Sequence, residues 1–117
     1  MRLFQFIVPL YDNAGKPVER GQFEQWESAL VDIAGGLTKG PRQSGVWLDE
    51  KGKEYRDESI AYTVALGQDG DKVGDIDNRL QRINAAFFAL FSDQLALFRA
   101  EIGTARIIER PHNETAA

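Results

Sequence analysis

Cysteine is absent from the sequence. This absence excludes disulfide bonds, thiolate catalysis and cysteine-ligated metal or iron–sulfur sites. It is compatible with the cytoplasm, where we expect the protein to work. Histidine occurs once, as His112 close to the end of the chain. A Ser-His-Asp triad and a histidine-based zinc site are therefore not expected, and we predict neither a metal nor a cofactor.

Long apolar runs and an excess of positive charge are missing as well. No stretch approaches the roughly 20 apolar residues of a membrane span, and the apolar run at the N-terminus is too short for a signal peptide. The 117 residues include 14 Lys and Arg against 18 Asp and Glu, which gives a net charge of −4. An acidic surface repels phosphate backbones and anionic lipids. We therefore expect no nucleic-acid partner and no membrane partner.

The clearest structural pattern that is present is a strand at residues 58–66. Apolar and small residues alternate there with a strict period of two. One face carries Ile60, Tyr62, Val64 and Leu66, and the other carries Ala61, Thr63 and Ala65. We expect the large side chains to be covered by helices, while the face with the small side chains stays open.

Two amphipathic helices are predicted, at residues 22–34 and 75–91, each with apolar residues three and four positions apart. Gly35 and Gly36 end the first helix, because glycine tolerates the left-handed conformation of a C-terminal cap. The stripes of the two helices and the inward faces of the strands predict one core. Its members are Phe4, Phe6, Trp26, Leu30, Ile33, Tyr62, Val64, Leu80, Ile83, Phe87 and Leu90.

The remaining segments complete the order of elements. Residues 2–9 predict a strand that Pro9 ends, and residues 37–43 a loop. A short strand at 44–49 and a turn at 50–52 lead back into the strand at 58–66 as a β-hairpin. Residues 95–101 fit either a helix or a strand. We predict a strand, because one helix from 75 to 102 would far exceed the usual length of about 11–12 residues. Residues 104–109 predict a further short strand.

The predicted fold is therefore α+β, with the order β-α-β-β-α-β of the ferredoxin-like fold. Two split βαβ units with right-handed crossovers give a four-stranded antiparallel sheet in the order 4-1-3-2, with both helices on one face. We expect one domain over residues 1–110 and a disordered polar tail over residues 111–117.

Several short segments recur at the spacing of a known family. These are Gln25-Trp26, Gly36-Leu37-Thr38, Ser44-Gly45-Val46-Trp47, Asp49-Glu50-Lys51-Gly52-Lys53, Arg56-Asp57-Glu58-Ser59, Phe88-Ala89-Leu90-Phe91-Ser92 and Thr104-Ala105-Arg106. Together they resemble a family of small bacterial ferredoxin-like proteins catalogued only as a domain of unknown function. The resemblance covers about residues 3 to 109 and implies the same fold. It implies no activity and no catalytic residue.

The topology gathers polar residues at one end of the sheet. The loop at 10–20, the hairpin at 49–58 and the turn at 92–94 should all lie there. The ligand-binding residues we predict at this end are Tyr11, Asp49, Tyr55, Arg56 and Glu58. Crowded carboxylates can act as acid and base or ligate a hard cation. Charged hairpin tips are more typical of solvated ends that prevent edge-to-edge aggregation, and the residues by themselves favour that interpretation.

The function these features favour is a non-enzymatic module. We expect it to be a homodimer that associates through the open face of its sheet and binds a partner protein or a small ligand. The alternative is a cofactor-independent acid–base enzyme of the dimeric ferredoxin-like kind, acting on a small carbonyl or phenolic compound. A third class, a nucleic-acid or metal binder, has the least support in the sequence. The same fold serves many functions, so the site has to decide between them.

Overall fold

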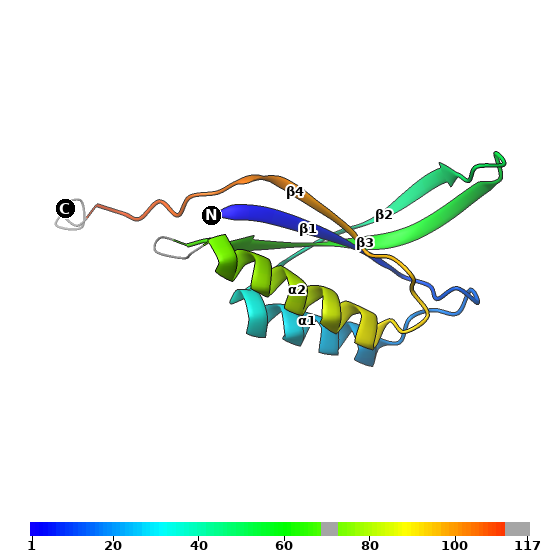
Figure 1. Cartoon of the computed structure of the whole chain (residues 1–117), viewed down its shortest axis with the longest axis horizontal. Coiled ribbons are helices and arrows are strands. Elements are labelled where there is room, and N and C mark those ends of the chain that lie inside the picture. Colours follow the sequence, from blue (N-terminus) through cyan, green and yellow to red (C-terminus); the bar gives the residue numbers. More distant parts are fainter. Residues whose placement is uncertain (69–72, 112–117) are drawn as a thin grey trace.

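A computed structural model describes residues 1–68 and 73–111 of the chain. The elements follow in the predicted order (Figure 1): β1 (Arg2–Pro9), α1 (Arg20–Ala34), β2 (Thr38–Leu48), β3 (Glu54–Leu66), α2 (Val73–Leu90) and β4 (Phe98–Thr104). The four strands form one antiparallel sheet in the order β2-β3-β1-β4. Both helices lie on the same face of this sheet. The prediction of a ferredoxin-like α+β fold is confirmed.

The register between the two central strands decides which residues face the helices. Phe4 lies opposite Val64, and Phe6 lies opposite Tyr62. These four side chains are buried, as are Val8, Ile60 and Leu66 on the same face. The alternation predicted for residues 60–66 is thus present, and it joins two adjacent strands into one apolar surface for the helices to cover.

Trp26 of α1 is the centre of the core. Its side chain is fully buried and makes edge-to-face contacts with four aromatic rings at centroid distances from 5.7 to 6.2 Å. The four rings are those of Phe6, Tyr62, Phe87 and Phe91. The predicted core residues are buried except Ile33 and Leu90, which are half-buried at its margin.

β2 corrects the loop expected at residues 37–43. The strand begins at Thr38, and its pairing with β3 shifts between Lys39 and Arg42. A Cβ atom on Gly40 would lie 3.1 Å from the carbonyl oxygen of Ala61, so the close approach of the two strands depends on this glycine. Glycine and proline together gave the appearance of a loop, whereas they form a β-bulge inside an edge strand.

β4 corrects the two strands expected near the end of the chain. The segment is a strand and not a helix, but it spans Phe98–Thr104 instead of 95–101. The strand predicted at 104–109 is absent, because β1 begins at Arg2 and offers no partner beyond Met1. Beyond β4, the backbone amide of Ala105 still donates a hydrogen bond to the carbonyl of Met1 at 2.9 Å. Most of the predicted tail, residues 112–117, lies outside the described residues.

Two segments project from opposite ends of the sheet (Figure 1). At one end the β2–β3 hairpin continues past Pro9, the last residue of β1, which pairs with Ser59. At the other end residues 105–111 run on from β4. The Cα radius of gyration is 17.3 Å, whereas about 13 Å is expected for a compact domain of this length. The helices cover the part of the sheet that contains β1 and β4 and leave the projecting hairpin uncovered (Figure 1).

Candidate functional site

Asp49 builds the turn at the tip of the hairpin. Its Oδ1 atom accepts hydrogen bonds from the backbone amides of Lys51 and Lys53, both at 2.9 Å. Gly52 occupies the left-handed region at φ 79°, which glycine adopts without steric cost. Asp49, one of the predicted ligand residues, therefore stabilises the turn through Oδ1, and its Oδ2 atom is left for other contacts.

Two aromatic rings stack across the hairpin next to this turn. Trp47 and Tyr55 lie opposite each other in register, with ring centroids 4.5 Å apart and planes inclined by 16°. The Trp47 indole N–H donates to Asp57 at 2.6 Å, and the Tyr55 hydroxyl donates to Asp49 at 3.3 Å. The result is an aromatic surface flanked by two carboxylates, with Trp47 still 51% exposed.

Trp47 and Asp57 were not among the predicted ligand residues, although the sequence held a signal for both. In a hairpin, residues at equal distances from the turn are cross-strand partners. Counting outward from the turn at 50–52 pairs Trp47 with Tyr55 and leaves Asp57 diagonal to Trp47.

Arg56 and Glu58 lie on the opposite face of the hairpin from Tyr55, because successive side chains of a strand alternate. Arg56 forms an exposed ion pair with Glu54 at 3.2 Å. Val46 and Leu48 are on this face too and are 54% and 63% exposed. The structure thus divides the predicted residues of the hairpin between two surfaces, one aromatic and acidic, the other aliphatic and mixed in charge.

The base of the hairpin adjoins the loop that follows β1. The amide of Leu10 donates to the carbonyl of Glu58 at 3.0 Å, which places Tyr11 beside the base. Tyr55 lies three residues farther along β3, or about 10 Å. The five predicted residues therefore extend along the hairpin from its base to its tip.

The loop at 10–20 and the turn at 92–94 meet, as the topology predicted. The amide of Asn13 donates to the Asp93 carboxylate at 2.7 Å, and the Asn13 side chain donates to the Asp93 carbonyl at 2.6 Å. Gln94 adds a further bond to Asn13 at 3.1 Å. These bonds fix the entrance to α1 against the exit from α2.

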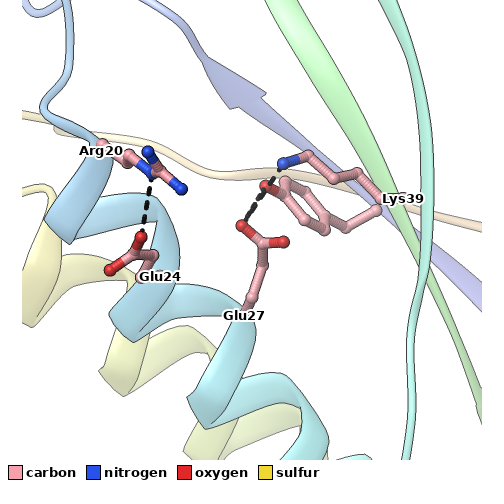
Figure 2. Close-up of polar contacts among 5 residues, drawn as sticks. Arg20, Glu24, Glu27 and Lys39 are labelled. Carbon is pink, nitrogen blue, oxygen red and sulfur yellow. Dashed lines mark hydrogen bonds and ion pairs between the residues drawn. The ribbon is translucent and has the colours of Figure 1, made fainter.

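A second polar cluster joins α1 to the sheet. The Tyr62 hydroxyl donates to Glu27 at 3.3 Å, and the Lys39 ammonium lies 3.4 Å from the same carboxylate oxygen (Figure 2). Burial, followed by the negative charge of Glu27, raises the pKa of Tyr62 well above its ordinary value. The Tyr62 hydroxyl therefore remains the hydrogen-bond donor to Glu27. Nothing in the sequence indicated this link, since Tyr62 was assigned to the core alone.

A cavity of about 200 Å³ lies at the opposite end of the sheet from the hairpin. Its lining includes Leu3, Gly36, Thr38 and Thr63 and contains no acidic or basic side chain. Within the described ranges, no group of three His, Asp or Glu side chains is placed to hold a metal ion. No helix in the same ranges is long and apolar enough to cross a membrane.

No protein-family model matches the sequence, and no curated protein matches it either. The resemblance to a domain of unknown function is therefore still a prediction. Solved structures do match. A divalent cation tolerance protein (CutA1) from Thermus thermophilus superimposes with a TM-score of 0.58 at 12% identity, over 97% of this chain and 90% of that one.

Two further structures have the same arrangement. The periplasmic divalent cation tolerance protein CutA from Archaeoglobus fulgidus has a TM-score of 0.56 at 14% identity and covers 97% of this chain and 89% of that one. A phage SAM lyase in complex with S-methyl-5'-thioadenosine has a TM-score of 0.58 at 11% identity, over 86% and 89%. At such identities the likeness shows the fold alone. These neighbours include a lyase and cation tolerance proteins, so the fold does not select a function.

Proposed function

We propose that the protein is a non-enzymatic ferredoxin-like module that forms a homodimer through the open face of its sheet and binds a partner or small ligand along its hairpin. The observation that carries the proposal is the one-sided cover of the sheet. Both helices lie on one face, and no described segment crosses the other in Figure 1. The segment after β4, a rival candidate for this cover, runs away from the sheet.

The chemistry of the open face supports self-association. Thr63 and Ala65 lie at its centre and, like Leu3 and Ile7 beside them on β1, are half-buried, whereas Ala61 is already buried within the chain. Phe98 of β4 lies opposite Ile7 and is 65% exposed. Small central residues with larger apolar neighbours form a shallow apolar surface, which monomers seldom expose without use. A second copy related by a two-fold axis would bury it, which is the commonest arrangement among oligomers.

The hairpin is the part of the site with recognisable chemistry. The faces of aromatic rings attract cations, and the neighbouring Asp49 and Asp57 carry negative charge. The ammonium of Lys53 already lies over the Tyr55 ring, 5.3 Å from its centroid, so Trp47 offers the face for a further cation. A guanidinium or ammonium group on a partner or ligand suits this surface. The proposed site also includes Tyr11, Arg56 and Glu58 at the base of the hairpin and on its reverse face.

The enzyme alternative draws support from a surface hollow of about 700 Å³ whose lining includes the carboxylates of Glu24, Glu27 and Asp32. It requires an enclosed pocket between sheet and helices in which acid and base groups converge. The cavity of about 200 Å³ carries no such group, and Tyr62 is held protonated by burial and by Glu27. We also keep the cytoplasm as the proposed compartment. A structural neighbour is described as periplasmic, so cell fractionation is the appropriate test.

A charge at the centre of the open face tests the dimer. Thr63→Arg should dissociate it and leave the circular dichroism unchanged, because Thr63 points away from the helices. Gln81→Arg, an equal change on the exposed surface of α2, is the matched control and should keep the wild-type mass. Light scattering reads both variants. Equal masses for wild type and Thr63→Arg would contradict the proposed interface.

Chemical-shift mapping tests the hairpin. Arginine amide serves as the cationic probe and inorganic phosphate as the anionic control. Arginine amide should shift the amides of Trp47, Asp49 and Tyr55, while phosphate leaves them in place. Shifts confined to residues 36–43, at the other end of the sheet, would contradict the site.

A further inference from the structure

The two projecting segments carry five of the eleven exposed large apolar side chains of the described residues. The hairpin exposes Val46, Trp47 and Leu48, each to more than half. Residues 105–111, here called the C-terminal segment, expose Ile107 to 70% and Ile108 to 81%. A two-stranded ribbon is only marginally stable by itself in water, and an extended segment with two exposed isoleucines is even less so. Both segments therefore offer exposed apolar side chains to a neighbour, and none of the described residues covers them.

The outer edge of β2 has room for one more strand. β2 is the first strand of the sheet, and its register with β3 is regular from Arg42 to Leu48. Pro41 precedes this stretch, and Pro111 follows residues 105–110. A proline cannot donate to a ladder, so the two prolines delimit stretches of similar length. An unpaired edge of this kind accepts an extended segment by strand addition.

The C-terminal segment cannot reach the hairpin of its own chain. Ala105 is hydrogen-bonded to Met1, at the opposite end of β1 from Pro9, where the hairpin begins to project. The eight residues of β1 separate the two points by about 26 Å along the strand. From Ala105, Ile108 can extend only about 10 Å. Contact between the two segments therefore requires two copies.

We infer that the partner accepted by the hairpin is the C-terminal segment of a second copy, which adds as a strand to the free edge of β2. This inference rests on the proposed function, whose binding site it assigns to a specific partner. Ile107 and Ile108 supply apolar side chains to Val46, Trp47 and Leu48. Arg106 and Arg110 bring guanidinium groups to a ribbon whose aromatic face carries Asp49 and Asp57. In a two-fold homodimer the exchange is reciprocal.

Disulfide trapping tests the inference in the full chain, which has no cysteine of its own. A Val46→Cys copy is mixed with an Ile108→Cys copy under mild oxidation, and mass spectrometry identifies the linked peptides. The mixed disulfide is expected. The matched control pairs Val46→Cys with Leu95→Cys, because Leu95 is 95% exposed and lies in neither segment. Equal yields from the two mixtures would overturn the inference.

Tryptophan quenching gives a second reading that needs no cross-link. Trp26 is fully buried and Trp47 is half exposed, so acrylamide reports on Trp47. Ile107→Asp combined with Ile108→Asp should increase quenching, and Leu95→Asp should not. If the double variant quenches like wild type, the inference is wrong. The proposed dimer interface is tested separately: it is wrong if the Thr63→Arg variant has the same mass as the wild type by light scattering.

Discussion

Replacing Phe87 by alanine removes the side chain that joins α2 to the centre of the core. The ring is fully buried, stacks on Phe91 at 4.9 Å and meets the edge of Trp26 at 5.7 Å. Truncating a buried phenylalanine to alanine costs about 3–5 kcal/mol, which includes the cavity left behind. Since small domains have about 5–15 kcal/mol of total stability, we expect a large loss of unfolding free energy.

Phe88 supplies the matched control one position along the same helix. It is 40% exposed, and its ring lies edge-on to that of Phe87 with centroids 5.3 Å apart. Phe88→Ala should therefore cost about 1 kcal/mol or less. Urea melts followed by circular dichroism measure both variants at one protein concentration, because self-association contributes to the apparent stability. A loss below about 1 kcal/mol for Phe87→Ala, or equal losses for both variants, would refute the assigned helix face.

Two further changes test single contacts. Gly67→Ala should destabilise the protein more than Gly52→Ala, because both glycines have φ 79° but only at Gly67 would the new Cβ lie 2.8 Å from the buried Ile76; thermal melts that rank the two the other way would contradict this packing. Tyr62→Phe should abolish the part of the stability loss above about pH 10 that comes from this side chain. The unfolded tyrosine ionises near pH 10, whereas burial and Glu27 raise the pKa of Tyr62 in the fold, so the folded state holds more protons there and wild-type stability falls as the pH rises above about 10. Urea midpoints that fall equally in the variant would show that this hydroxyl is not responsible.

The sequence predicted the faces of the strands better than their ends. Alternation at 60–66 requires only neighbouring residues, so Ile60 and Tyr62 could be assigned to the helix side from the sequence alone. The start of β2 depends on a bulge at Gly40, where Ala61 of another strand comes close. The limits of β4 depend on its pairing with β1, about 100 residues earlier in the chain. Neither partner is visible from the local pattern.

The candidate site shows the same division. Topology predicted which end of the sheet carries the polar residues and that the loop at 10–20 meets the turn at 92–94. It did not predict that the hairpin continues past Pro9, because the length of an overhang follows from where the neighbouring strand ends. The stacking of Trp47 on Tyr55 could have been predicted by counting from the turn. The bond from Tyr62 to Glu27 could not, because it depends on how α1 is placed over the sheet.

The molar mass of the full chain in solution tests the central claim most directly. Multi-angle light scattering coupled to size-exclusion chromatography measures it across micromolar concentrations. Burial of the open face by a second copy predicts a mass of at least twice the chain mass of 13.1 kDa. A mass of 13.1 kDa at every concentration would contradict the claim, because no second copy would then cover the open face.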